Sequence, residues 1–275
     1  MDIIIPTANN LEQKNYSLYF TLRSVLAQSI TSQIFVVANG SQTDYEKLRK
    51  KLNNEFGSLV NILNGSKREK NISYARNLGV RAGKSEKIVF MDDDTILGNN
   101  TVLEQVDDTL NREDFYCGAY RFWTHPNWSD CIKADMQINQ VRHILKAKSF
   151  LPQSVERLSG KQSFSQFTYI GNFGGIRRSV LKNIEGFDES FCGWTYQDTD
   201  LMMRLCVQGY RYELMSHDGL YVYHLSHAVD KSKYRAVNKS KYRSKQQKFG
   251  KRLNVNHFFG IYDDEKFELI EPFNQ

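Results

Sequence analysis

Three consecutive carboxylates, Asp92, Asp93 and Asp94, follow the apolar run Lys87–Met91 and are the side chains best placed to do chemistry. Adjacent carboxylates repel one another and are costly unless a cation or hydrogen-bond donors offset them. Their oxygens suit Mg²⁺ or Mn²⁺, and such an ion can bridge the diphosphate of a nucleotide. A solvated acidic turn is the alternative. The cluster therefore indicates either a metal site or an acidic turn, and other motifs in the sequence are needed to distinguish the two.

The elements that position this cluster alternate between strands and helices. Strands are predicted over Ile3–Ile5, Gln33–Ala38, Val60–Leu63 and Lys87–Met91, and helices over Tyr16–Ala27, Asp44–Phe56 and Ile72–Ala82. This alternation predicts an α/β fold with a mostly parallel sheet and helices on both faces. Ligands of such sheets bind beyond the carboxyl ends of the strands, so the loops after Ile5, Ala38 and Met91 should converge on one crevice.

The composition narrows the class of protein. With 275 residues, 40% hydrophobic and 25% charged, the chain has the composition of one globular α/β domain with a small extension. It has no run of the roughly 20 apolar residues that a membrane-spanning helix needs. The opening residues Met1–Pro6 lack the pattern of a secretion signal, so we expect a cytoplasmic protein. The four cysteines show no CxxC spacing, which argues against a zinc site or a disulfide framework.

The N-terminal part, over about residues 2–110, resembles the family 2 glycosyltransferases of the GT-A (Rossmann-like) fold. The resemblance rests on the opening strand and turn Ile3–Asn9, on Tyr-Ala-Arg-Asn-Leu-Gly at residues 74–79, and on the triple aspartate. It implies that Asp94 binds the metal directly. It also implies a set of residues on the nucleotide-sugar side, namely Pro6, Thr7, Ala8, Asn39, Arg76, Asn77, Asp92 and Asp93.

Two positions depart from the family pattern. Ala8 stands where the family has an aromatic residue, and Ala38-Asn39 stands where it usually has two aspartates, the later one reading uracil. An amide both donates and accepts hydrogen bonds whereas a carboxylate only accepts, so Asn39 leaves the identity of the base open. For Arg76, a structural salt bridge is the alternative to contact with the nucleotide.

The run Gly171–Gly209 resembles the catalytic segment of the β-1,4-galactosyltransferases. That resemblance implies that Trp194 and Gln197 contact the acceptor, although Gln197 stands where a glutamate is usual. It implies that Asp198 is the catalytic base, which takes the proton of the acceptor hydroxyl. The alternative for Asp198 is a first-turn acid on the helix predicted over Asp198–Gln208.

Two further features of this part follow from the same resemblance. The pair Gly174 and Gly175 would let the backbone approach the donor sugar, with a tight turn as the alternative. His224, at the end of a strand, fits the family's metal-binding histidine, and His227 is the second choice. An imidazole ligand favours Mn²⁺ over Mg²⁺.

The C-terminal segment is strongly basic. Ten Lys or Arg residues and one Asp lie between Asp230 and Leu253, and Lys231–Arg235 recurs as Lys239–Arg243. This helical extension could close over the diphosphate, contact an anionic lipid-linked acceptor, or lie on the inner membrane face as a peripheral contact. A solvated helix is the alternative, and no recognised nucleic-acid-binding module accompanies it.

These features predict a catalytic domain over residues 1–228, divided at residues 110 and 111 into a nucleotide-sugar half and an acceptor half, and a basic extension over 229–275. We expect an inverting, metal-dependent enzyme that transfers a hexose from a UDP-sugar to a glycan or lipid-linked saccharide in bacterial polysaccharide or glycoconjugate synthesis. The alternatives are a retaining GT-A transferase and a non-catalytic glycan-binding relative. A nucleotidyltransferase would need a Gly-rich basic loop near the N-terminus, which Pro6–Leu11 does not provide.

Overall fold

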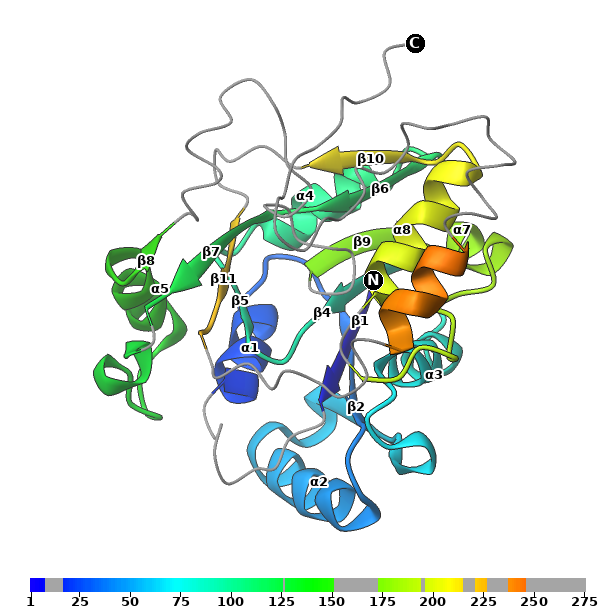
Figure 1. Cartoon of the computed structure of the whole chain (residues 1–275). Coiled ribbons are helices and arrows are strands. Elements are labelled where there is room, and N and C mark those ends of the chain that lie inside the picture. The colour runs from blue at the N-terminus through cyan, green and yellow to red at the C-terminus, as the bar shows by residue number, and fades with distance from the viewer. Residues whose placement is uncertain are drawn as a thin grey trace.

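Two sheets organise the molecule, as Figure 1 shows for the computed structural model. The structure describes residues 1–7, 17–125, 127–150, 173–193, 196–214, 221–226 and 237–245. Among these residues, a seven-stranded sheet forms the centre and a four-stranded sheet lies beside it. The fold thus keeps one main sheet and adds a second one that the sequence did not reveal.

The seven-stranded sheet has the strand order β10-β6-β9-β4-β1-β2-β3. Its strands are β1 (Asp2–Thr7), β2 (Gln33–Ala38), β3 (Val60–Asn64), β4 (Lys87–Met91), β6 (Phe115–Gly118), β9 (Phe173–Arg177) and β10 (Arg211–Leu214). Strand β9 is antiparallel to both β4 and β6, and the remaining neighbours pair in parallel. The prediction of a mostly parallel sheet is confirmed.

The four-stranded sheet has the order β5-β11-β7-β8. It consists of β5 (Thr95–Leu97), β11 (Tyr221–His224), β7 (Tyr120–Thr124) and β8 (Ser149–Phe150). Because β4 belongs to the large sheet and β5 to the small one, residues 92–94 form the link between the two sheets.

Helices cover both faces of the large sheet, because alternate side chains of a strand point to opposite faces. Ile3 and Ile5 pack with α1 (Ser17–Leu26), α2 (Gln42–Phe56) and α4 (Val102–Thr109). Ile4 packs on the other face with α3 (Ile72–Ala82), α7 (Arg178–Asn183) and α8 (Gln197–Val207). The expected helices on both faces are therefore present.

The remaining helices lie outside these two layers. Helix α5 (Ile138–Ala147) packs with Ile96 and Tyr223 of the small sheet. Short 3₁₀ turns occur at η1 (Gly57–Leu59), η2 (Ser66–Arg68) and η3 (Trp128–Cys131), and a further helix covers residues 237–245. No helix in the described part of the chain has the length and apolar character that crossing a membrane would need.

Helix boundaries follow local capping. Asn71 caps α3 by accepting a hydrogen bond from the Tyr74 amide, and α3 begins and ends where the sequence predicts. Strand β4 also has the predicted bounds. Helix α2 begins at Gln42 rather than at Asp44, because Ser41 and Asp44 form a capping box. Strand β1 does not close at Pro6 but continues to Thr7, which pairs with Ala38.

The predicted domain halves share one sheet. Strands β1 and β4 come from residues 1–110, while β6, β9 and β10 come from residues 111–228. The division at residue 110 therefore does not separate two folding units, and the boundary at residue 228 stays a prediction. Residues 151–172, within the second of these halves, lie outside the described residues.

Candidate active site

The link between the two sheets is fastened to the first strand. Thr7 at the end of β1 donates a hydrogen bond from Oγ1 to Oδ2 of Asp93 at 2.6 Å, and Thr21 of α1 donates to the backbone oxygen of Asp93 at 3.1 Å. The Asn39 amide at the end of β2 donates to the Thr7 carbonyl at 2.7 Å. The loops after β1, β2 and β4 thus converge, as predicted. Asp93 has a structural contact here, and its nucleotide contact stays a prediction.

Arg76 joins the link to the second half of the chain. Its guanidinium, on α3, is 1% exposed, pairs with Asp92 at 3.2 Å through Nη2, and pairs with Asp198 through Nη1. It also lies 5.0 Å from the centroid of the Phe187 ring. The buried Arg76 therefore joins two partly exposed aspartates, Asp92 and Asp198, in one charged group. The salt-bridge alternative for Arg76 is realised.

The Asp198 carboxyl lies in the first turn of α8. Burial raises the pKa of Asp198 above its ordinary value, although the Arg76 guanidinium acts in the opposite direction. A carboxylate with a raised pKa binds a proton more readily than an exposed one, which suits a general base.

Asp94 and His224 form a second pair. The Asp94 Oδ1 atom and the His224 Nδ1 atom are 3.2 Å apart, and both side chains are buried. The backbone at residue 94 is held by a hydrogen bond from the Leu225 amide at 2.9 Å, which fixes the ends of β5 and β11 together.

This pair fits a divalent ion. Two ligands at right angles, each roughly 2.1 Å from an octahedral ion, lie about 3.0 Å apart. The observed 3.2 Å separation matches that spacing. Within the described ranges no group of three His, Cys, Asp or Glu side chains gathers to hold a metal, so further ligands would have to come from elsewhere.

Trp123 is a neighbour of this pair that the sequence did not single out. It lies opposite His224 in the pairing of β7 with β11, and its ring meets the imidazole edge-on at 4.4 Å between centroids. Arg121 lies over the Trp123 ring at 4.7 Å. An aromatic run ending at a strand terminus, Phe122-Trp123, was the available signal, but the pairing partner of this strand could not be read from the sequence.

Two buried amides present unsatisfied oxygens. Asn39 and Gln197 are each 2% exposed, and neither Asn39 Oδ1 nor Gln197 Oε1 accepts a hydrogen bond from any residue that the structure describes. A buried polar atom without a partner costs free energy, so both atoms are suited to accept a bond from a ligand.

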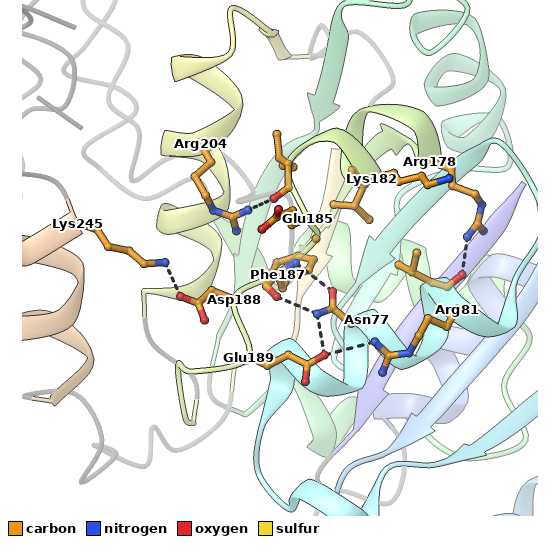
Figure 2. A pocket seen from close by; sticks show the side chains of 14 residues that line it. Asn77, Arg81, Arg178, Lys182, Glu185, Phe187, Asp188, Glu189, Arg204 and Lys245 are labelled. Atoms are coloured by element: carbon orange, nitrogen blue, oxygen red, sulfur yellow. Dashed lines mark hydrogen bonds and ion pairs between the residues drawn. The ribbon is translucent and has the colours of Figure 1, made fainter. Parts of the chain in front are cut away.

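Asn77 faces a different part of the molecule. Its side chain donates to the Phe187 carbonyl at 2.8 Å and to Glu189 Oε1 at 3.0 Å, and it accepts from the Phe187 amide at 3.0 Å. Figure 2 shows these bonds among residues that line a cavity, whose volume is about 820 Å³. Asn77 thus clamps residues 187–189, and its contact with a nucleotide stays a prediction.

The glycine pair lies inside the large sheet. Gly174 pairs with Phe90, and Gly175 pairs with Val89 and Cys117. A Cβ atom on Gly175 would come within 2.5 Å of Val106 and 2.9 Å of the Cys117 sulfur. Core packing therefore gives a structural reason for glycine at position 175, and its approach to the donor sugar stays a prediction. The assignment of Gly174 stays a prediction, as does that of Pro6, which is buried in β1.

The helix over residues 237–245 packs on the catalytic segment. Lys245 bonds to Asp188 and, at 2.8 Å, to the fully buried Asp200 of α8. Tyr242 stacks on Tyr196 at 5.5 Å, and Asn238 donates to the Cys192 carbonyl. This part of the basic extension is therefore a docked helix, not a solvated one.

Some predicted residues cannot be placed. Ala8, Trp194 and His227 lie outside the described residues, as does the first basic repeat, Lys231–Arg235.

The model of glycosyl transferase family 2 matches residues 2–185, which is more than half of the 275-residue chain. The model described as the N-terminal domain of galactosyltransferase matches residues 158–228. A search of curated proteins finds no match.

Solved structures with a similar fold have low sequence identity. GalNAc-T7, crystallised with UDP, GalNAc and Mn²⁺, is 14% identical with a TM-score of 0.61; the match covers 92% of this chain and 54% of that one. The mannosyltransferase PcManGT of Pyrobaculum calidifontis, in complex with GDP-Man and Mn²⁺, is 15% identical with a TM-score of 0.56, covering 93% and 64%. The structure of residues 1–349 of S. aureus TarS in complex with UDP-GlcNAc is 14% identical with a TM-score of 0.59. This match covers 92% of this chain and 66% of that one. The chain thus spans about half to two thirds of the length of these similar chains.

Proposed function

Because the chain belongs to glycosyl transferase family 2 and is a GT-A glycosyltransferase, we propose that it transfers a hexose from a UDP-sugar to a hydroxyl of a glycan acceptor with inversion at the anomeric carbon. The observation that carries this proposal is the group formed by Asp92, Arg76 and Asp198, which brings the carboxylate matched to the catalytic base, Asp198, next to the aspartates that follow β4. Direct displacement needs one such carboxylate beside the acceptor hydroxyl.

Each residue then has a defined task. Asp198 accepts the proton of the attacking hydroxyl, and Arg76 holds the Asp198 carboxylate in position. The unsatisfied Asn39 oxygen accepts a hydrogen bond from the base of the donor, and that of Gln197 accepts one from the acceptor. Asp94 and His224 would hold Mn²⁺, which when bound neutralises the charge of the leaving diphosphate. The similar structures that contain UDP or UDP-GlcNAc support this choice of donor, and those that contain Mn²⁺ support the choice of ion.

We place the acceptor among glycans or lipid-linked saccharides of bacterial polysaccharide or glycoconjugate synthesis, and the protein in the cytoplasm at the inner membrane face. The basic extension supports this placement, because anionic lipids attract clustered lysines and arginines.

A donor screen tests the proposal. Melting temperatures are measured with Mn²⁺ and with UDP-Gal, UDP-Glc, UDP-GalNAc, UDP-GlcNAc or GDP-Man. A UDP-sugar should raise the melting temperature only with Mn²⁺ present, since a ligand bound by the folded state alone stabilises it. Absence of binding by every nucleotide sugar would refute the proposal. The anomeric configuration of the product distinguishes inversion from retention, in which Asp198 would only position the substrate.

The metal pair gives a second test. Asp94→Asn should abolish the Mn²⁺-dependent part of donor binding, because one of the two candidate ligands is lost. Asp107→Asn, on the exposed side of α4, is the matched control and should bind the donor as the wild type does. Calorimetry of the UDP-sugar with and without Mn²⁺ makes the measurement.

A further inference from the structure

A pocket of about 320 Å³ lies at the far end of the small sheet from His224. Helix α5 contributes Asn139, Arg142, His143 and Lys146, which are spaced so that they share one face of the helix. The turn after β5 contributes residues 98–100, and the first residue of β11, Tyr221, completes it. Tyr221 and His224 are three residues apart on one strand, or about 10 Å, so this pocket is separate from the candidate active site.

The pocket contains a buried cation, Arg142, for which the described residues supply no carboxylate partner. Arg142 is 7% exposed, yet it makes no ion pair with a carboxylate within the described part of the chain. Its guanidinium instead donates to neutral oxygens: to the Leu97 carbonyl at 2.8 Å, the Asn99 carbonyl at 3.1 Å, Asn139 Oδ1 at 3.0 Å and Asn100 Oδ1. A buried charge is costly unless an opposite charge accompanies it.

Other groups that line the pocket can donate hydrogen bonds to a ligand. The side-chain oxygens of Asn100 and Asn139 face the guanidinium, which leaves the amide NH₂ groups for other acceptors. Lys146 and His143 are exposed on the same face of α5, and none of the described residues that line the pocket is an Asp or Glu. Burial and a hydrogen bond to Tyr221 raise the pKa of Tyr223, so that its hydroxyl is neutral.

We propose that this pocket binds a phosphoryl group, whose oxygens accept bonds from Lys146, His143 and the two asparagines while its charge offsets that of Arg142. A lone carboxylate would leave part of this donor set unused, because it has two oxygens where a phosphoryl group has three. The phosphoryl group could belong to a soluble phosphate compound or to a phospholipid headgroup, since the recognising chemistry is the same.

Inorganic phosphate is the first probe. It is titrated into the full chain by calorimetry with divalent metals removed. The double variant His143→Gln, Lys146→Gln should weaken binding at least about ten-fold, the change that follows the loss of one charge-assisted hydrogen bond. Both side chains are exposed, so the variant keeps its fold. Lys133→Gln, exposed and outside the pocket, is the matched control and should bind as the wild type does.

Two further arms complete the test. Asp94→Asn should bind phosphate unchanged, which separates this site from the candidate active site. Vesicles of equal parts phosphatidylglycerol and phosphatidylcholine are then sedimented with the protein. Binding that the double variant loses identifies a lipid headgroup as the source, whereas phosphate binding without vesicle binding identifies a soluble compound. Absence of both, or binding that the double variant retains, would overturn the proposal.

Discussion

At the scale of single residues, the buried Arg76 determines how the candidate base behaves. It contacts Asp92 and Asp198, which are 16 and 122 positions away in the sequence. The Asp198 carboxylate is thereby held at one place before any substrate arrives, so that less has to be ordered when the acceptor binds.

Removing the base should separate binding from turnover. Asp198→Asn should lower kcat by about 1000-fold, since proton transfer by a positioned group contributes about 10² to 10⁴ in rate. The affinity for the UDP-sugar should not change. Steady-state kinetics and donor calorimetry measure the two effects, and full activity of the variant would show that Asp198 is not the base.

The pH dependence of turnover tests the role of Arg76. Asp198 can accept a proton only in its charged form, so kcat falls as the pH drops through its pKa. Burial raises that pKa, which places the fall at higher pH than for an ordinary aspartate, whose pKa is about 3.9. Arg76→Gln removes the charge that lowers this pKa, and should move the acid limb to still higher pH.

Arg76→Lys is the conservative control for this shift. It retains a positive charge and should move the limb less than Arg76→Gln does. An acid limb that is the same in all three proteins would show that the guanidinium does not act on Asp198.

The sequence allowed us to predict which residues belong to the site, but not which of them contact one another. Asp94 and His224 were proposed as metal ligands through two separate resemblances, and the structure brings them into contact. The bond between Arg76 and Asp198 could not be predicted, because it depends on how α3 and α8 pack on one face of the sheet. The packing of Gly175 in the core could not be predicted, because a glycine in a buried strand and a glycine near a ligand look the same in one sequence.

At the scale of elements, the helix over residues 237–245 braces the start of α8. The buried Asp200 lies two residues after Asp198 and is held by both Arg204 and Lys245. Through these bonds the extension acts on the turn that carries the base. Figure 2 shows Lys245 reaching Asp188 from this helix.

Lys245→Met removes the contact with Asp188 and should change how the free energy of unfolding depends on pH. Burial alone would raise the pKa of Asp188, but hydrogen bonds from Lys245 and Ser190 lower it to about 2. A lowered carboxyl pKa gives stability that is present above the unfolded value of about 4 and is lost as the pH falls toward 2.

The stability difference between wild type and Lys245→Met should therefore be largest above pH 4 and shrink below it. Urea unfolding at several pH values measures it. Arg243→Met, exposed on the same helix, is the control. A difference that does not depend on pH would contradict the assignment.

Elements with strong local signals were predicted well, and those fixed by distant pairing were not. Helix α3 has a capping asparagine and a closing glycine, and its bounds were predicted correctly. The direction of β9 and the existence of the small sheet depend on pairings between segments far apart, such as Trp123 with His224. Periodicity within a segment carries no information about such partners.

At the scale of the whole molecule, the first strand is tied to the loop before β4 and to helix α7. Asp2 is fully buried, accepts bonds from the Ser85 amide and hydroxyl at 2.8 Å, and pairs with Arg178 of α7 at 2.7 Å. These bonds join β1, the end of α3 and the start of α7 at the edge opposite the candidate site.

Breaking this tie should destabilise the whole fold. Asp2→Ala leaves Arg178 without its partner and should lower the free energy of unfolding by about 3 kcal/mol. Arg49→Ala removes an exposed pair with Glu46 and should cost less than about 1 kcal/mol. Urea denaturation compares the two, and equal effects would show that the Asp2 contact is not a buried tie.

The position of β9 also sets an order of assembly. Strand β9 lies between β4 and β6, so the side of the sheet that contains β6 and β10 has no pairing with β4 until residues 173–177 have been synthesised. During translation, strands β1, β2, β3 and β4 can pair as soon as the first part of the chain has been synthesised. One edge of β4 then stays unpaired while more than eighty further residues are added. Such an edge attracts other strands, so the nascent chain has the greatest need of chaperone protection in this interval.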